Sequence, residues 1–202
     1  LNTQLFERVK IVYDQHEQLS LTAEQQTLLE KTYKGFTRNG ANLSLNDKEL
    51  LREIDKQLAT LKLKFSENIL AETQQYLQHF TSLEPLSGLP DFVLEMLAQE
   101  AQKRLLPGWV ITLDMPIYTA VMKYADNRDL RQKLFTDYHS RCAGASAFNN
   151  EDNVLRIAEL RQARAALLGY PSYAALALEE RMAETPEKVM NFLNELLDKA
   201  KP

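Results

Sequence analysis

The sequence predicts an all-α protein of mainly antiparallel helices, with one long helix near residues 47–80 and at most one or two short strands near residues 109–113. Leu, Ala, Glu, Gln and Lys are abundant and favour helix, whereas Val and Ile are too sparse for an extensive sheet. Apolar residues recur every three or four positions along most of the chain. Hydrophobic residues make up 45% and charged residues 26% of the 202 residues, as in ordinary globular proteins.

Two helices are expected before residue 42. The first runs from about Asn2 to Gln18, and its apolar stripe has members three or four positions apart: Leu5, Val9, Val12 and His16. The second begins at Thr22, which forms a capping box with Gln25, and it ends at Asn39–Gly40. Its buried side is expected to carry five residues: Leu28, Leu29, Thr32, Tyr33 and Phe36.

A long third helix is expected to begin near Asn46. Its apolar residues first keep a strict spacing of three and four positions: Leu51, Ile54, Leu58, Leu61 and Phe65. Ile69, Tyr76 and Phe80 extend the pattern to about 34 residues, or roughly 50 Å at 1.5 Å per residue. Two interpretations stay open, the spine of an antiparallel bundle or a coiled-coil dimer. The bundle is favoured because the spacing loses strictness after Phe65.

The middle of the chain is predicted to contain a loop, a helix and a strand. Residues 81–90 are rich in Ser, Gly and Pro, and Pro90–Asp91 then begins a helix that Pro107–Gly108 ends. The helix is expected to run through Phe92, Met96 and Leu105. Residues 109–113 (WVITL) are β-branched and aromatic enough for a strand, but no partner is evident. Its partner is therefore an unidentified segment or lies outside the 202 residues.

Two shorter helices and a loop are expected next. The first helix begins at Asp114 and Pro116 and reaches Ala125. Asp126 is expected to cap the second, whose apolar members are spaced four apart: Leu130, Leu134, Tyr138 and Cys142. Residues 143–150 are small and polar and are predicted to form a loop.

Residues 154–189 predict three helices separated by two tight joints. The first helix has an apolar stripe of Ile157, Leu160, Ala163 and Leu167. Gly169 suits the residue after a helix end, and Pro171 suits the first turn of the next helix. Thr185 and Pro186 repeat this logic at the start of the third helix. That helix contains Val189, Phe192, Leu193, Leu196 and Leu197.

Charge and composition exclude several classes of partner. The net charge is −4 and the two signs are intermixed, so we expect no nucleic-acid partner. No apolar run approaches the roughly 20 residues that cross a bilayer, so we expect no membrane partner. Cys142, the single cysteine, is expected to be a small buried apolar residue. The chain begins at Leu1, which leaves a removed signal peptide open, although a cytoplasmic location is favoured over a periplasmic one.

No catalytic, cofactor-binding or metal-binding residue is expected in these residues. The zinc motif H-E-x-x-H places two imidazoles one helical turn apart, but residues 16–20 read HEQLS and lack the second histidine. His79 and His139 have no second histidine at helical spacing, and a metal pair of His139 with Cys142 is the weaker alternative. Motifs for a nucleophilic serine, a phosphate loop or a dinucleotide are absent.

Two charged groups each have two interpretations. Glu151–Asp152 and Glu179–Glu180 favour first-turn positions or solvated helix faces over an acid–base pair. Three arginines could hold a peptide carboxylate, but helix-surface ion pairs are favoured: Arg156, Arg161 and Arg164.

Two linked patterns resemble the thimet oligopeptidase family of zinc metallopeptidases, which includes oligopeptidase A and bacterial dipeptidyl carboxypeptidase. Residues 160–174 read LR-x-x-x-A-x-LLGY-x-x-YA, and residues 182–193 read MA-x-TPE-x-V-x-x-FL. Residues 36–41 (FTRNGA) give a weaker match. The similarity is strong over residues 153–197 and weaker over residues 5–71.

The resemblance implies that residues 1–202 are a helical portion of a larger peptidase, with a hairpin-like part at 1–80 and a second helical part at 90–202. It implies that zinc belongs to the intact enzyme, bound by H-E-x-x-H and a downstream glutamate that these residues lack. There, a zinc-bound water would attack the peptide carbonyl with a glutamate as general base. The partners implied are short peptides and the catalytic part of the same chain. A stand-alone helical interaction module without enzymatic activity is the alternative.

Overall fold

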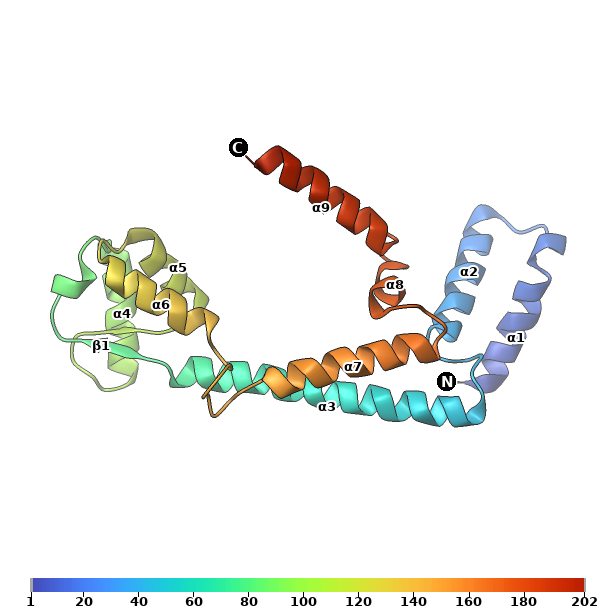
Figure 1. Ribbon diagram of the computed structural model, residues 1–202, viewed down its shortest axis with the longest axis horizontal. Coiled ribbons are helices and arrows are strands. Elements are labelled where there is room, and N and C mark those ends of the chain that lie inside the picture. Colours follow the sequence, from blue (N-terminus) through green and yellow to red (C-terminus); the bar gives the residue numbers. More distant parts are fainter. Residues whose placement is uncertain (1, 202) are drawn as a thin grey trace. The chain divides into compact units, whose positions relative to one another are not determined.

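The computed structural model describes residues 2–201, and helices dominate these residues (Figure 1), which confirms the predicted fold class. The α-helices are α1 (Thr3–Asp14), α2 (Ala23–Thr37), α3 (Leu45–Gln75), α4 (Asp91–Lys103), α5 (Met115–Tyr124), α6 (Arg128–His139), α7 (Glu151–Leu167), α8 (Tyr173–Leu178) and α9 (Pro186–Ala200). Two short 3-10 helices, η1 (His16–Gln18) and η2 (Glu84–Leu86), and two strands, β1 (Gln78–Phe80) and β2 (Trp109–Ile111), complete them. The chain divides into two compact units, Leu1–Ala59 with Ile157–Pro202 and Thr60–Arg156.

In the first unit, α1 and α2 form a hairpin held together by aromatic rings. Tyr13 and Tyr33 stack with their ring centroids 3.8 Å apart. The ring of Phe6 lies 6.0 Å from Tyr33 and 5.5 Å from Phe36. Such pairs contribute roughly 0.5–1.5 kcal/mol each beyond the area they bury. Aromatic contacts therefore decide which sides of α1 and α2 face each other.

The apolar stripe predicted for α1 is wrong in part. Leu5 and Val12 are 48% and 42% exposed, whereas Phe6 is buried. On α2, Leu28 was expected to be buried but is 68% exposed. The reason is the size of the rings, since Phe6 and Tyr13 fill the interface and turn the smaller aliphatic side chains outward.

The capping box predicted at the start of α2 is confirmed. The Gln25 backbone N–H donates to Thr22 Oγ1 at 3.3 Å, and the Thr22 N–H donates to Gln25 Oε1 at 3.0 Å. The helix ends at Thr37, two residues before the predicted position, and the chain turns through Gly40 at φ +83°. A side chain at Gly40 would also meet Leu51, because a Cβ there would come within 2.5 Å of it.

The long helix α3 has 31 residues, which corresponds to about 46 Å. Leu51, Ile54 and Leu58 are buried, which confirms the first part of the predicted stripe. The predicted end at Phe80 is wrong, because α3 ends at Gln75.

The chain leaves the helical path after α3 to form a small antiparallel sheet. Phe80 of β1 pairs with Trp109 of β2, and Gln78 pairs with Ile111. The partner of the strand at 109 is therefore a segment of this chain that the sequence did not identify, which is the first of the two predicted alternatives. That strand is shorter than predicted. Gly108 makes the pairing possible, because it has φ +83° and a Cβ there would lie 2.2 Å from the Phe80 carbonyl oxygen.

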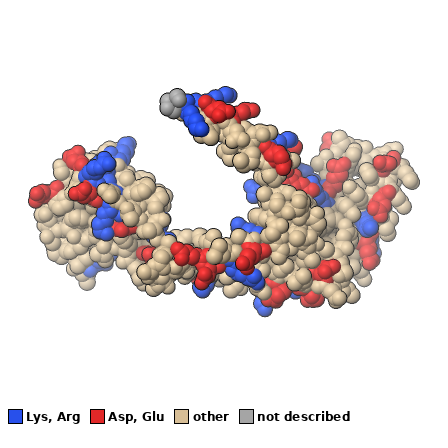
Figure 2. Space-filling model, in the orientation of Figure 1, with Lys and Arg blue, Asp and Glu red and all other residues tan. Residues whose placement is uncertain are grey.

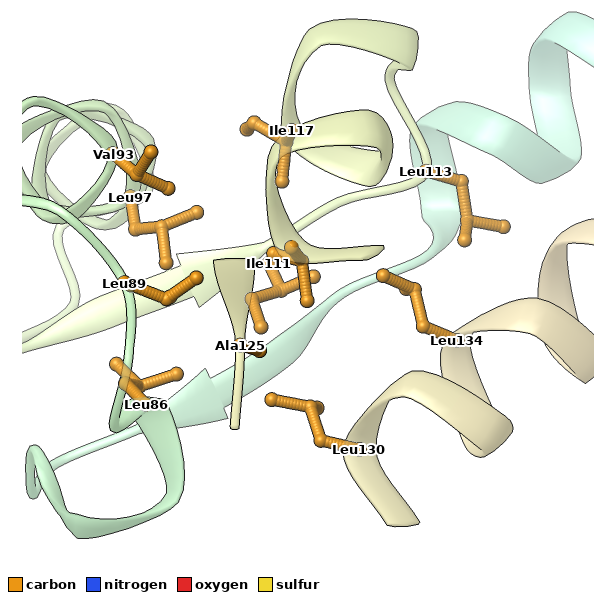
Figure 3. Close-up of a cluster of buried hydrophobic side chains, with 11 residues drawn as sticks. Leu86, Leu89, Val93, Leu97, Ile111, Leu113, Ile117, Ala125, Leu130 and Leu134 are labelled. Carbon is orange, nitrogen blue, oxygen red and sulfur yellow. The ribbon is translucent and has the colours of Figure 1, made fainter. Parts of the chain in front are cut away.

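The core of the second unit lies where α4, α5 and α6 meet around β2. Figure 3 shows side chains of these helices, such as Leu97, Ile117 and Leu134, gathered around Ile111. The whole cluster consists of Leu86, Leu89, Val93, Leu97, Ile111, Leu113, Ile117, Val121, Ala125, Leu130 and Leu134. Leu105, predicted on the preceding helix, lies beyond its end at φ +57° and is almost fully exposed.

The start and end of α6 differ from the prediction. Asn127 caps the helix, because its Oδ1 accepts a 3.1 Å hydrogen bond from the Leu130 N–H. Asp126 instead accepts a hydrogen bond from Ser87 Oγ at 2.9 Å. The helix ends at His139, so Cys142 lies in the following turn, at φ +57°, and not on the helix. The helix predicted from Asp114 to Ala125 is confirmed as α5 with those two residues as its caps.

The three helices predicted over residues 154–189 are confirmed as α7, α8 and α9. After α7, Gly169 has φ +85°, and the next N–H, of Tyr170, donates to the Ala165 carbonyl at 2.9 Å. At the start of α9, Thr185 Oγ1 accepts a 3.2 Å hydrogen bond from the Lys188 N–H. Both joints are therefore stabilised locally.

Two details of this segment were predicted wrongly. Pro171 does not begin α8, because Ser172 caps it by accepting a 3.1 Å hydrogen bond from the Ala175 N–H. The α7 stripe includes the buried Ala165 but not the exposed Ala163. Periodicity alone does not show which of Ala163 and Ala165 is the buried one.

Candidate functional site

The three histidines are distributed over separate places in the fold. His16 Nδ1 lies 2.6 Å from the Tyr13 carbonyl oxygen, and His139 Nδ1 lies 2.8 Å from that of Phe135. His79, on β1, has its Nε2 2.5 Å from the Pro107 carbonyl oxygen. Each imidazole thus has a backbone partner. Among residues 2–201, no three His, Cys, Asp or Glu side chains gather as metal ligands.

Cys142 is buried, as predicted, and its thiol is held in the protonated form. Burial raises the pKa of Cys142 to about 11, and the neighbouring Glu72 carboxylate adds to this effect. A thiolate is the form that attacks substrates and binds metals. A thiol with this raised pKa is mostly protonated at neutral pH and is therefore a weak nucleophile.

The loop that contains Cys142 is fixed to α3 by polar side chains. Glu72 accepts hydrogen bonds from the Cys142 N–H at 2.5 Å and from Ser146 Oγ at 2.9 Å. The buried Asn150 donates to the Phe65 carbonyl oxygen at 3.0 Å. These bonds order the loop before α7. Sequence reasoning missed them, because a lone glutamate and a lone asparagine show no local pattern.

A cluster of polar side chains in the first unit is centred on Arg38. We call it the Arg38 cluster, and its members are Lys34, Arg38, Tyr170, Glu179 and Glu180. The Arg38 guanidinium forms an ion pair with Glu179 and donates to the Leu176 carbonyl oxygen at 2.7 Å. Tyr170 Oη donates to Glu179 at 2.6 Å. Lys34 Nζ lies 2.8 Å from the Glu180 carboxylate and 3.4 Å from that of Glu179.

The charges of the Arg38 cluster stabilise one another. Burial opposes the charged form of Glu179, but hydrogen bonds from Tyr170 and Arg38 outweigh it and lower the pKa of Glu179. Burial and the same carboxylate raise the pKa of Tyr170. The hydrogen bond to Glu180 raises the pKa of Lys34. Glu179 therefore serves as an ion-pair partner. The Glu180 side chain is 46% exposed and that of Glu179 is 31% exposed, so the predicted solvated position holds for Glu180 and only in part for Glu179.

The Arg38 cluster joins two segments that are far apart in the sequence. Arg38 lies in FTRNGA, and Tyr170 lies in LLGY, which are both parts of the patterns that carry the family resemblance. The cation of Arg38 also lies 5.8 Å from the centre of the Tyr170 ring. The sequence offered one indication of this cluster, because Arg38 and Tyr170 both lie in the patterns that carry the family resemblance.

The remaining charged candidates have structural partners. Arg164 Nε donates to Asp55 Oδ1 at 2.8 Å, which confirms the ion-pair interpretation for that residue. The guanidinium of Arg161 lies 5.0 Å from the centre of the Tyr173 ring, and its Nε is buried without a hydrogen bond. Arg156 also has an interaction partner, through a hydrogen bond, a ring contact or an electrostatic interaction. Glu151 and Asp152 occupy the first turn of α7, as predicted.

Each unit also carries an open groove. In the second unit, a groove of about 550 Å³ is lined by apolar side chains of α3 and α7, including Ile69 and Leu155, with Arg141 beside them. In the first unit, a more polar groove of about 710 Å³ is lined by Phe6, Arg52 and their neighbours. Charged side chains, including Lys48, Glu49 and Asp55, lie along the groove of the first unit.

The comparisons with known proteins point to peptidases. Residues 121–202 match the family model described as Peptidase family M3. The chain is 33% identical over 182 residues to Oligopeptidase A of Haemophilus influenzae, covering 88% of this chain and 27% of that protein. It is 30% identical over 202 residues to Dipeptidyl carboxypeptidase of Escherichia coli, covering 100% of this chain and 30% of that protein.

Oligopeptidase A of Escherichia coli is 29% identical over 202 residues, which cover 98% of this chain and 30% of that protein. The chain thus spans less than a third of the length of the curated relatives it matches. These matches confirm the resemblance that residues 160–174 and 182–193 carry.

Proposed function

We propose that this chain is the helical, non-catalytic portion of a zinc metallo-oligopeptidase of peptidase family M3. In this role it forms scaffold and part of the wall of a channel that admits short peptides. Its own residues would act by shape and by holding helices in place. Zinc, held by residues outside this chain, would supply an activated water for peptide hydrolysis.

One observation supports this proposal above all others. Nearly the whole chain aligns with peptidases more than three times as long as the aligned part. Among the described residues, each histidine lies against a backbone carbonyl oxygen, and the pKa of the cysteine is raised by burial and by Glu72. A division of labour between this scaffold and a separate metal-binding part accounts for both findings.

The Arg38 cluster gives the scaffold a physical basis. It connects the end of α2 with the α8 segment through charge-assisted hydrogen bonds, which are stronger than neutral ones. A channel wall must keep its shape while peptides enter and leave. Ion pairs between helices that are distant in sequence provide such rigidity without catalytic groups.

The experiment compares this 202-residue chain with the longer protein that carries it. We expect the longer protein to contain one zinc per chain by atomic absorption and to cleave quenched-fluorescence peptides of about ten residues, but not a folded protein. The 202-residue chain should cleave neither substrate. As a matched control, the longer protein with His16, His79 and His139 each replaced by alanine should keep its zinc.

Two results would contradict the proposal. The first is a longer reading frame that encodes no H-E-x-x-H helix. The second is tight, stoichiometric zinc binding by the 202-residue chain, since this would place a metal site among the residues assigned here to the scaffold.

A stand-alone interaction module is the second candidate, and the exposed apolar side chains of α9 favour it. Phe192 and Leu196 are 63% and 54% exposed, as expected of a helix that binds another protein. The same experiment separates the two functions, because an interaction module would show neither zinc nor peptidase activity in the longer protein.

A further inference from the structure

Helix α9 presents an apolar face that the described residues leave uncovered. None of its residues is buried. The larger apolar side chains on it are each about half exposed or more: Met190 (55%), Phe192 (63%), Leu193 (48%), Leu196 (54%) and Leu197 (49%). Soluble monomers rarely expose contiguous apolar patches larger than a few hundred Å². A helix of this kind is expected to be covered in the working protein.

The apolar residues of α9 lie on one side of the helix. At 100° per residue, positions 189, 193, 196 and 200 lie within one narrow sector, while Asn191 and Asp198 lie on the opposite side. Figure 2 shows charged side chains along one edge of α9 and uncharged ones along the other. This separation is typical of a helix that lies in an apolar groove of a partner.

The start of α9 is held firmly within its unit. Thr185 caps it, and α8, which precedes it, is tied to α2 by the ion pair of Arg38 with Glu179. The connecting turn is closed by hydrogen bonds, including the one from the Glu184 N–H to the Arg181 carbonyl at 3.0 Å. The helix is therefore presented by an ordered base.

The relatives indicate what covers this face. Their similarity to this chain extends through α9, since the family match runs over residues 121–202. About 70% of the length of Escherichia coli Oligopeptidase A lies outside the aligned part, so that relative has a large body of further polypeptide available to cover the corresponding helix. We propose that the apolar face of α9 docks into an apolar helical groove of the metal-binding part of the same polypeptide. This inference rests on the proposed function and names the surface by which the scaffold holds the catalytic part.

Cysteine labelling tests the docking directly. Leu193→Cys places a thiol on the apolar face, and the matched control Asn191→Cys places one on the opposite face of the same helix. The native Cys142 is buried and adds little background. In the longer protein at pH 7, we expect a maleimide to react with Leu193→Cys at least about tenfold more slowly than with Asn191→Cys. In the 202-residue chain, the two rates should agree within about threefold.

Hydrogen exchange on the unsubstituted proteins provides a second measurement that needs no variant. The amides of α9 should exchange more slowly in the longer protein than in the 202-residue chain. Equal exchange, together with equal labelling in the longer protein, would overturn the docking.

The outcomes separate this inference from the proposed function. A longer protein that binds zinc and cleaves peptides, but labels both cysteines equally, leaves the function standing and refutes the docking. Protection of Leu193→Cys in a longer protein without zinc or activity refutes the proposed function, and it also refutes docking to a metal-binding part, because another segment of the longer protein then covers the face. Protection of Leu193→Cys already in the 202-residue chain also refutes the docking. If this protection depends on protein concentration, a second copy of the chain covers the apolar face. If it is independent of concentration, another part of the same 202 residues covers that face.

Discussion

Replacement of Arg38 by methionine tests whether the Arg38 cluster holds the α8 segment in place. Methionine keeps the apolar stem of the side chain but removes the ion pair with Glu179 and the 2.7 Å hydrogen bond to the Leu176 carbonyl oxygen. A hydrogen bond to a charged group is worth roughly 1.5–3 kcal/mol. Because Arg38 and Glu179 stay 21% and 31% exposed, solvent reduces this value, and we expect a total loss of about 2 kcal/mol.

The assay is hydrogen exchange of the α8 amides, followed by mass spectrometry. A loss of about 2 kcal/mol in the free energy of local opening accelerates exchange roughly thirtyfold. The matched control is Arg52→Met, because Arg52 and its ion-pair partner Glu49, three residues away, are 72% and 69% exposed, so solvent screens their attraction. That control should change the opening free energy by less than about 0.5 kcal/mol.

A double-mutant cycle with Glu179→Gln isolates the ion pair itself. We expect a coupling energy of about 1 kcal/mol between positions 38 and 179. The pKa of Glu179 is lowered in the folded chain, so its contribution is complete above the usual carboxyl pKa of 4.5 and is lost as the pH falls through the lowered value. Additive effects in the cycle, or equal exchange in Arg38→Met and Arg52→Met, would refute the reasoning.

Three further predictions concern the second unit. Gly108→Ala forces a Cβ at positive φ to within 2.2 Å of the Phe80 carbonyl oxygen. We expect this change to lower the free energy of unfolding of the second unit by about 3 kcal/mol or more, measured by urea unfolding followed by tryptophan fluorescence. An unchanged unfolding midpoint would count against the strand pairing. Leu97→Ala empties a fully buried position and should cost about 3–4 kcal/mol by the same measurement, and a loss below about 1 kcal/mol would show that the core repacks. The thiol of Cys142, with its pKa raised to about 11, should react slowly with iodoacetamide at pH 7 and faster as the pH rises, whereas rapid reaction at pH 7 would contradict its burial.

The accuracy of the sequence predictions depended on how local the determining interactions are. The Thr22 capping box and the Thr185 cap involve residues three positions apart, and both were predicted correctly. The first part of α3 was also predicted correctly, because Leu51, Ile54 and Leu58 follow helical spacing. Such signals depend only on the backbone geometry of a single helix.

Predictions failed where a distant segment decides the outcome. Tyr76 and Phe80 continue the helical spacing of α3, yet the chain forms β1 there because β2 offers it a hydrogen-bonding partner. On α1, the face is chosen by the rings of α2, so Leu5 lies outside and Phe6 inside. Neither choice is visible within a window of neighbouring residues.

For the candidate site, the amino-acid sequence by itself determined the helical class, the joints at Gly169 and Thr185 and the likeness to a family of peptidases. Only the tertiary structure decided that Arg38 and Tyr170 share the Glu179 carboxylate and that Cys142 is protonated in a buried turn. The physical reason is distance along the chain. Caps and joints are formed by groups a few residues apart, whereas ion pairs between helices and the burial of a thiol depend on segments that only folding brings together.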